Sequence, residues 1–316
     1  IQAINVSSTL LINSFSIPQS SVNSEISWAV ILFFSKFFTL CDISEKLPFS
    51  LNILNESFGY LFFKIAKLWS LKIMACISFL KPLNEFFDNE TPQVLDMLDN
   101  YGELFNSYKY YLKKEVESLI ETFDDIEWNE DPLLSLFIDD CNDNQKDITK
   151  GGAKYNHYGI TTVALENTVN SLYNIKKLVF DDKKYTLTDL NKMRKNNFKK
   201  DKYQDVYKIL RNMKPCFGMD DREIINITND VIQLLEDCLK DYTNEFGGKI
   251  KFGLTNSSYI FSDDEISASF DGRKVVEPFN PYISLDTEKD FTEVLRFASK
   301  IDLDGCKFNG NVIDLM

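Results

Sequence analysis

Residues 151–190 read GGAKYNHYGITTVALENTVNSLYNIKKLVFDDKKYTLTDL and combine two kinds of sequence. A glycine pair and a Lys-Tyr-Asn turn open the stretch, and glycine allows a backbone to turn tightly. Residues 163–179 then carry apolar side chains at helical spacing, which predicts an amphipathic helix. A loop follows, and Thr186 or Thr188 is expected to cap the next helix. The stretch therefore predicts a specific turn that leads into a layer of helices.

The same periodicity predicts further elements on both sides of this stretch. The expected helices are 101–123, 222–242 and 287–301. The expected strands are 131–141, 247–261 and the apolar residues near 312–315. Residues 269–286 are interpreted as a loop. Strands that alternate with helices indicate an α/β layer or barrel.

Composition and charge limit the classes of function. The chain has 316 residues, of which 44% are hydrophobic and 26% charged, enough for a substantial core in one domain or two. Its net charge of -13 argues against a nucleic-acid partner, and the basic run at 192–202 is interpreted as a solvated face. The six cysteines form no C-x-x-C motif and predict reduced thiols in the cytoplasm.

The first 90 residues differ in kind from the rest, with a charge near -1 and a single glycine. Three lysines interrupt the apolar run at 60–80: Lys64, Lys67 and Lys72. A buried helix whose lysines reach toward water is one interpretation, an interfacial membrane helix a second, and a misassigned reading frame a third. A signal peptide is not expected, because no basic n-region precedes the first apolar run, and a membrane partner is not expected either. We divide the chain into an atypical apolar segment, 1–90, and an orderly part, 91–316.

Two possible ligand-binding motifs lack residues that their chemistry requires. Asp140, Asn142 and Asn144 have the spacing of a calcium loop, but Gln145 and Gly151 stand where a glycine and a bidentate glutamate are required. GGAKYN is not followed by G-K-[ST], so it is no phosphate-binding loop, and it is no dinucleotide fingerprint. No metal site is predicted.

Three ordered motifs resemble those of the glycyl radical enzymes of the pyruvate formate-lyase superfamily. They are GGAKYN at 151–156, NSLYNIKKLVFDDKKYTLTDL at 170–190 and SFDGRKVVEPFNPYIS at 269–284. In that superfamily GGA-x-YN, DSL-x-AIKKLVFEEKK and PDGR-x-x-EP recur in this order, whereas Asn170 stands here where Asp is usual. The resemblance covers 91–316 and implies part of a ten-stranded α/β barrel, made of two halves of parallel strands.

The resemblance also implies a chemistry. Such enzymes hold a protein-derived radical on a backbone glycine, installed by an S-adenosylmethionine-dependent activase, and pass it to a cysteine. The thiyl removes a hydrogen atom from a small organic substrate. This chain is thus expected to resemble a lyase or dehydratase of anaerobic metabolism, with no bound cofactor and a radical-activating enzyme as partner. A homodimer stays open.

The implied barrel-loop or pocket residues are Gly151, Gly152, Ala153, Tyr155, Asn156, Asp271, Gly272 and Arg273. The two parts of the radical relay do not match, because the sequence contains no R-V-x-G-[YF] motif and no typical cysteine motif. Cys41 lies at a comparable distance upstream, but its neighbours differ. We therefore expect an incomplete enzyme and leave open whether it is active. The alternative is a catalytically inactive barrel remnant that binds a ligand or a partner.

Overall fold

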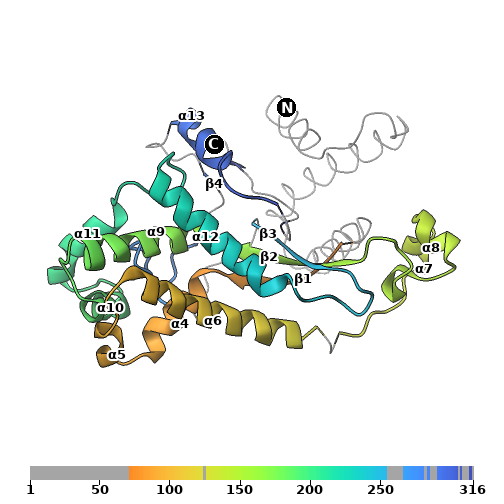
Figure 1. The fold of residues 1–316 in the computed structure, drawn as a ribbon, viewed down its shortest axis with the longest axis horizontal. Coiled ribbons are helices and arrows are strands. Elements are labelled where there is room, and N and C mark those ends of the chain that lie inside the picture. The colour runs from red at the N-terminus through yellow and green to blue at the C-terminus, as the bar shows by residue number, and fades with distance from the viewer. Residues whose placement is uncertain are drawn as a thin grey trace, which may run out of the picture. The chain divides into compact units, whose positions relative to one another are not determined.

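A computed structural model describes residues 71–316 apart from 124–125, 255–265, 281–282, 285–289, 305–306, 308–312 and 315–316 (Figure 1). The chain divides into two compact units, Ile1–Ile65 and Ala66–Met316, and all described residues belong to the second. The candidate thiol Cys41 and most of the apolar segment lie outside the described residues.

The described unit is built on a parallel sheet with the strand order β1-β2-β3. These strands are β1 (Leu71–Ser78), β2 (His157–Val163) and β3 (Ile250–Gly253). Parallel strands need long crossovers, and helices supply them here (Figure 1). Beyond β3 the ladder continues as one parallel bridge between Phe252 and Lys307. A second parallel pair joins β4 (Ile283–Ser284) to β5 (Ile313–Asp314).

Helices follow each of the three strands. After β1 come α4 (Leu80–Asn89), α5 (Pro92–Asp96), α6 (Tyr101–Glu121), α7 (Pro132–Ser135), α8 (Asp139–Asp143) and the 3-10 turn η1 (Ile148–Lys150). After β2 come α9 (Leu165–Ile175), which continues as the π-helical η2 (Lys176–Asp181), then α10 (Leu187–Lys195), η3 (Asp201–Tyr203), α11 (Gln204–Arg211) and α12 (Arg222–Leu239). After β3 and β4 comes α13 (Phe291–Ala298).

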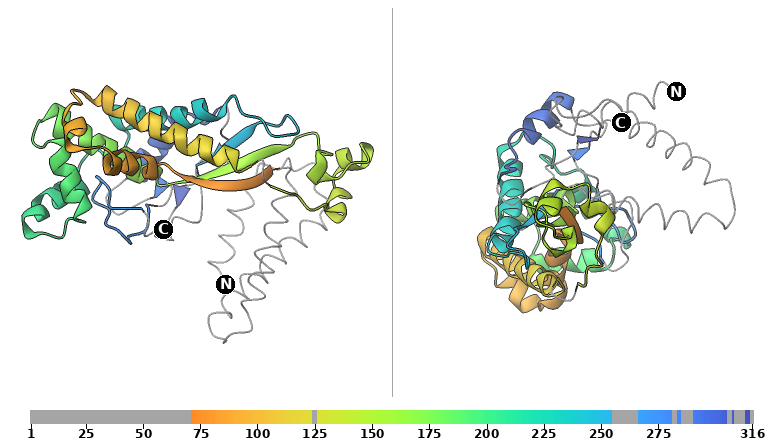
Figure 2. Two further views of the ribbon diagram at one scale, coloured as in Figure 1. Left: turned by 90° about the horizontal axis from the view of Figure 1, so that it is seen from below. Right: turned by 90° about the vertical axis from the view of Figure 1, so that its right-hand side faces the viewer.

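The core lies between the sheet and the long helices. Figure 2, left, shows α6 and α12 on the same side of the three strands. Alternation along the strands places Ile77, Ile160 and Phe252 under these helices, each no more than 1% exposed. Tyr108 of α6 is fully buried, and its hydroxyl donates to the Phe79 carbonyl at the start of α4 (3.0 Å). Burial on this scale fixes how the helices lie on the sheet.

Most of the expected helices are confirmed. Helix α6 covers the prediction for 101–123, α12 that for 222–242, and α13 that for 287–301. Thr186 caps α10, because its hydroxyl accepts from the Asp189 N–H (3.0 Å). Strand β3 lies within the segment expected to contain a strand.

The strand expected at 131–141 is wrong, because this segment forms α7 and α8. Asp131 caps α7 by accepting from the Leu134 N–H (3.1 Å), and Pro132 at the first helical position favours a helix start. The apolar residues Leu134 and Cys141 are buried with Ile148 and Ala153 in a small separate cluster, against which Ile138 packs. A short apolar run alone did not distinguish these helices from a strand.

The interpretation of 60–80 as a buried helix is also wrong where the structure describes this run. Residues 71–78 form β1, which pairs along its length with β2 and has one irregularity between Ile73 and Ala75. Pairing in the sheet therefore overrides a pattern that fits a helix. Strand β1 and helix α4 both precede residue 91, and Leu80, Leu83 and Phe87 of this segment are fully buried.

No described helix combines the length and the apolarity that a membrane crossing requires.

Candidate functional site

The carboxyl edge of the parallel sheet is the first place to look for a site, because ligands of α/β proteins bind outside the carboxyl ends of their strands. Ser78, Val163 and Gly253 end the three strands on this edge. Thr162 ties two of the strands together, since its hydroxyl donates to the Gly253 carbonyl (2.9 Å). Directly after β2, Ala164 adopts φ +63°, and Glu166 lies buried in the first turn of α9.

A buried polar stripe on α9 faces this edge. Asn167, Ser171 and Asn174 recur at helical spacing, and each is at most 1% exposed. Their side chains hold residues 266–280, the loop that carries the Asp-Gly-Arg motif. The Asn174 amide donates to the carbonyls of Phe270 (2.9 Å) and Leu210 (3.0 Å). Polar groups buried in this way must be hydrogen-bonded, so the stripe and the loop require each other.

Asp271 is the centre of the loop. Its Oδ2 accepts from the Asn167 amide (2.6 Å), and its Oδ1 accepts from the Arg273 N–H (3.1 Å) and from the Ser269 hydroxyl. Its own N–H donates to Ser171 Oγ (3.1 Å). Asn167 Oδ1 in turn accepts from the Asn280 N–H (2.9 Å), so one asparagine joins the middle and the end of the loop.

Arg273 holds the loop from the other side. It is 1% exposed, and its guanidinium donates to four backbone carbonyls, those of Ile266, Ser267, Lys274 and Glu277, at 2.7–3.1 Å. Its guanidinium carbon also lies 4.8 Å from the centroid of the Phe279 ring. Gly272, between Asp271 and Arg273, has φ +87°, and a Cβ there would lie 2.7 Å from Arg211 Cγ. The Asp-Gly-Arg motif thus builds a closed turn.

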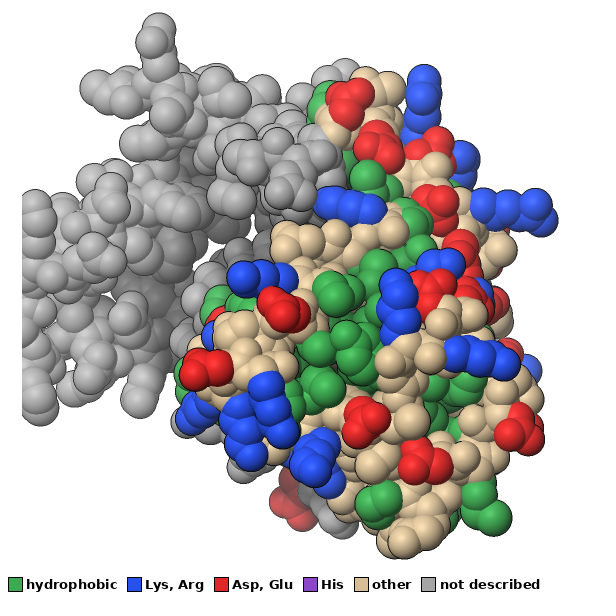
Figure 3. All heavy atoms as spheres, turned by 90° about the vertical axis from the view of Figure 1, so that its left-hand side faces the viewer, with side chains coloured by type: hydrophobic (Ala, Val, Ile, Leu, Met, Phe, Trp, Pro, Cys, Tyr) green, Lys and Arg blue, Asp and Glu red, His purple; other side chains and the backbone are tan. Residues whose placement is uncertain are grey.

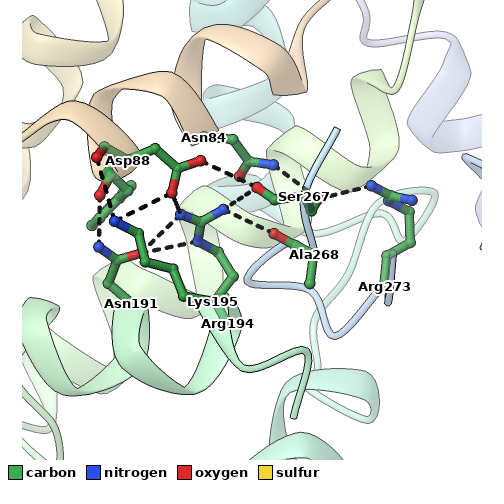
Figure 4. A network of polar contacts seen from close by, with 9 residues as sticks. Asn84, Asp88, Asn191, Arg194, Lys195, Ser267, Ala268 and Arg273 are labelled. Atoms are coloured by element: carbon green, nitrogen blue, oxygen red, sulfur yellow. Dashed lines mark hydrogen bonds and ion pairs between the residues drawn. The ribbon is translucent and has the colours of Figure 1, made fainter. Parts of the chain in front are cut away.

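A second arginine anchors the start of the same loop (Figure 4). Arg194 of α10 has a fully buried side chain, and it donates to the Asp88 carboxylate, to the Ser267 hydroxyl and to the Ala268 carbonyl (3.2 Å). Its Nε donates to Asn191 Oδ1 (3.1 Å). Burial lowers the pKa of Arg194, and the Asp88 carboxylate opposes that shift. An arginine so enclosed stays charged, since its ordinary pKa is far above neutrality.

The GGAKYN corner lies at the opposite end of β2. Gly151 has φ +84°, and a Cβ on Gly152 would lie 2.0 Å from the Lys146 carbonyl oxygen. The buried Asn156 is held through its carbonyl, which accepts from the Asn244 amide (2.7 Å). Ala153 is buried, and Tyr155 is 61% exposed. This is a tight structural corner at the amino end of the strand.

The structure therefore places the predicted site residues in two groups. Residues 151–156 precede β2, whereas residues 271–273 contact α9 beyond its carboxyl end. A seven-residue strand spans about 20 Å, so the groups are not brought together. Their role as pocket residues stays a prediction. Within the described residues, no group of three or more His, Cys, Asp or Glu side chains is placed to hold a metal ion.

Sequence reasoning missed the polar residues that hold the loop, namely Asn167, Ser171, Asn174 and Arg194. The signal in the sequence was weak, because Glu166, Thr168 and Asn170 place polar side chains on other faces of the same helix. Sequence reasoning also did not single out Cys76. This residue is exposed, and it pairs across the sheet with Thr161, which pairs with Gly253.

Comparison with known proteins identifies relatives of this arrangement. The family described as "Pyruvate formate lyase-like" matches residues 82–261, more than half of the chain. The chain is 29% identical to trans-4-hydroxy-L-proline dehydratase of Clostridioides difficile over 212 residues, which are 64% of this chain and 27% of that protein. It is 28% identical to (2S)-3-sulfopropanediol dehydratase of Klebsiella oxytoca, over 47% of this chain and 18% of that protein.

Solved structures show the same fold. The glycerol-bound B12-independent glycerol dehydratase from Clostridium butyricum superposes with a TM-score of 0.65 at 25% identity, over 75% of this chain and 32% of that one. Hydroxyproline dehydratase from Clostridioides difficile gives 0.68 at 24% identity, over 77% and 33%. The chain spans about a third or less of the length of these relatives. Its fold is part of the pyruvate formate-lyase type of α/β barrel, as the motifs predicted.

Proposed function

Because the chain belongs to the pyruvate formate lyase-like family of glycyl radical enzymes, we propose that it forms a barrel portion of a dehydratase or lyase. The substrate would be a small organic molecule, and the bond would break after a thiyl radical has removed a hydrogen atom. The curated relatives are dehydratases, a decarboxylase subunit and a sulfite-lyase, which supports this kind of reaction.

One observation of the structure carries the proposal. The loop 266–280 is fixed at the carboxyl edge of the sheet by three buried side chains of α9 and by two buried arginines. Radical chemistry needs a site that holds its substrate in a fixed position and excludes water. A loop held rigidly by buried hydrogen bonds would help to fix the position of the substrate. In this chain Asp271 and Arg273 would act by holding the loop, because the Asp271 carboxylate joins it to Asn167 of α9 and the Arg273 guanidinium donates to four carbonyls of the loop.

The radical itself would be protein-derived and installed by an S-adenosylmethionine-dependent activase, which the family resemblance implies. The 316 residues hold no R-V-x-G-[YF] motif, so on this proposal the radical glycine is supplied from outside them. Two thiols are candidates for the hydrogen abstraction. Cys41 lies outside the described residues, and Cys76 is exposed on the sheet face opposite to the buried Ile77.

An anaerobic reconstitution tests the proposal. The chain is combined with an activase, S-adenosylmethionine and a polypeptide that carries the radical glycine, and is given small hydroxylated substrates such as glycerol and trans-4-hydroxyproline. We expect loss of water from one of them, dependent on the activase and abolished by Cys41→Ser or by Cys76→Ser. The chain alone should show no glycyl doublet in electron paramagnetic resonance. Absence of turnover, together with absence of any rise in melting temperature on addition of substrates, would refute the proposal.

A cytoplasmic location and a role in anaerobic metabolism belong to the same proposal, because oxygen destroys glycyl radicals. The inactive barrel remnant is not favoured, since the curated relatives over the matched region are enzymes.

A further inference from the structure

Two exposed surfaces of the described unit carry opposite charge and unmatched apolar side chains. The first, called here the basic face, lies on α10, η3, α11 and the adjacent loop. Its exposed lysines and apolar residues are Lys192, Lys199, Lys200, Lys202, Lys208, Ile209 and Val276. Asp201 and Asp205 are also exposed on these elements, so the lysines outnumber the carboxylates. None of these lysines has a carboxylate within 4 Å in the described part of the chain, whereas neighbouring Lys195 and Arg211 pair with Asp88 and Glu277.

Aromatic rings hold several of the lysines of the basic face in place. The ammonium groups of Lys200 and Lys202 lie 5.8 and 5.2 Å from the centroid of the buried Tyr203 ring, so the ring keeps two like charges near each other. Lys274 lies 4.4 Å from the Tyr207 ring centroid on the same helix layer. Figure 3 shows this side of the molecule, with hydrophobic side chains near its centre and a mixture of Lys or Arg and Asp or Glu side chains around them. A positive surface with an apolar centre fits an acidic protein surface that has apolar side chains of its own.

The second surface, the acidic lobe, is residues 126–145 around α7 and α8. It holds six carboxylates and no Lys or Arg, and Glu127, Glu130, Asp139 and Asp143 are exposed without a basic partner within 4 Å among the described residues. Leu133, Leu136 and Phe137 are 68%, 66% and 72% exposed beside them. Three large apolar side chains so exposed and adjacent are unusual on a surface that contacts only water.

The two surfaces cannot meet within one molecule, because α7 and α8 lie at the opposite end of the described unit from α10 and α11 (Figure 1). We propose that the acidic lobe of one copy binds the basic face of a second copy, with Leu136 and Phe137 against Ile209 and Val276. Such a contact joins different patches on the two copies, so it is heterologous and leads to rings or open chains instead of a closed dimer. This inference does not depend on the proposed enzymatic function.

Neutralised variants test the proposal without reversing any charge. The face variant carries Lys199→Gln, Lys200→Gln and Lys202→Gln, and the lobe variant carries Glu130→Gln, Asp139→Asn and Asp143→Asn. A control with Lys109→Gln, Lys113→Gln and Lys114→Gln changes the net charge as the face variant does, at exposed positions of α6. The six positions changed in the face and lobe variants lie on the two surfaces, and none of them is buried.

Sedimentation velocity of the full chain at about 100 µM reports the outcome. We expect oligomers that grow with concentration and that weaken about tenfold or more in affinity between about 50 mM and 500 mM salt. Each surface variant should be monomeric, the control should associate like the parent, and an equimolar mixture of the two variants should stop at a 1:1 dimer. That mixture retains one intact face and one intact lobe.

Three results would overturn the proposal. The first is a parent chain that stays monomeric at low salt. The second is association that salt does not weaken or that the variants do not change, which is the behaviour of apolar aggregation. The third is a mixture of the two variants that forms no dimer. In that case, binding of the parent chain to anionic vesicles or to nucleic acid through the same lysines would assign the basic face to those partners.

Discussion

The side-chain amide of Asn167 donates to the carboxylate of Asp271, with 2.6 Å between Nδ2 and Oδ2, although 104 residues separate them in the chain. Both residues are more than nine-tenths buried. Because the same asparagine also accepts from the Asn280 N–H, one side chain fixes the middle and the end of the loop.

Replacing this asparagine should expose how much the loop depends on it. Asn167→Ala removes the hydrogen-bond partner of Asp271 Oδ2 and that of the Asn280 N–H, so we expect a loss of about 2–4 kcal/mol in the free energy of unfolding. Urea unfolding measures this loss, and a double-mutant cycle with Asp271→Asn should show coupling. The control is Asn212→Ala, whose amide donates to Lys208 at an exposed helix end and should change stability by less than about 1 kcal/mol. Equal effects of the two substitutions would contradict the role of Asn167.

Ala164 is held in the left-handed region at φ +63°. For a residue with a Cβ, this conformation raises the free energy of the folded state by about 1 kcal/mol or more. Ala164→Gly removes that strain but gives the unfolded chain more freedom, so stability should stay equal or rise by up to about 1 kcal/mol. Lys109→Gly, in the exposed interior of α6, should lose about 1 kcal/mol. Thermal melting of both variants checks the contrast, and a marked loss at Ala164 would show that its methyl group packs usefully.

Two adjacent glycines in the turn before β3 should respond very differently. A Cβ on Gly248 would lie 1.6 Å from the Asn156 carbonyl oxygen, whereas a Cβ on Gly247 would meet nothing within 4 Å and only its φ of +75° resists substitution. Gly247→Ala should therefore cost about 1 kcal/mol. Gly248→Ala should cost several times more or prevent folding, because backbone must move. Soluble yield and urea unfolding compare them, and similar costs would mean that the corner is looser than described.

His157 is the single histidine of the chain, so its titration can be isolated. Burial, and then the charge of Lys251, lowers its pKa below the ordinary 6.5, while its ring nitrogen accepts from the Lys249 N–H (3.1 Å). The unfolded chain then binds a proton more readily than the folded one, so stability is fully present above pH 6.5 and falls as the pH drops below it. His157→Asn, which keeps an acceptor, should flatten the stability profile between about pH 5.5 and 7. An unchanged slope would contradict this linkage.

Truncation tests the expected division of the chain. Removing residues 1–90 deletes β1 and α4, whose Leu80, Leu83 and Phe87 are fully buried, so the remainder should lose cooperative unfolding. Removing residues 1–65 keeps both elements and should preserve a cooperative transition. Circular dichroism melting distinguishes the two. If the shorter chain starting at residue 91 melts cooperatively, the boundary predicted from composition is right after all.

Much of the architecture was predictable because its cause is local. The helical spacing of apolar residues in α6, α9 and α12, the Thr186 cap and the glycines of the GGAKYN corner act within a few residues. The errors came where two structures fit the same pattern. Residues 131–141 formed two short helices, the first of them capped by Asp131, and residues 71–78 formed a strand because β2 was available as a partner.

The family and its fold were determined by the sequence itself, through three motifs in a fixed order whose turns and helix faces follow from nearby residues. Only the tertiary structure decided what those motifs do here. The motif resemblance places the charged residues Asp271 and Arg273 in a pocket, whereas Arg194 lies in a basic run that the sequence predicts to be solvated. The fold buries each of them against partners about 70 to 100 positions away or within their own turn, because a buried charge is tolerated only when its hydrogen bonds are met. Long-range pairing of this kind leaves no local signal, so the loop-holding role of these side chains could be read only from the folded chain.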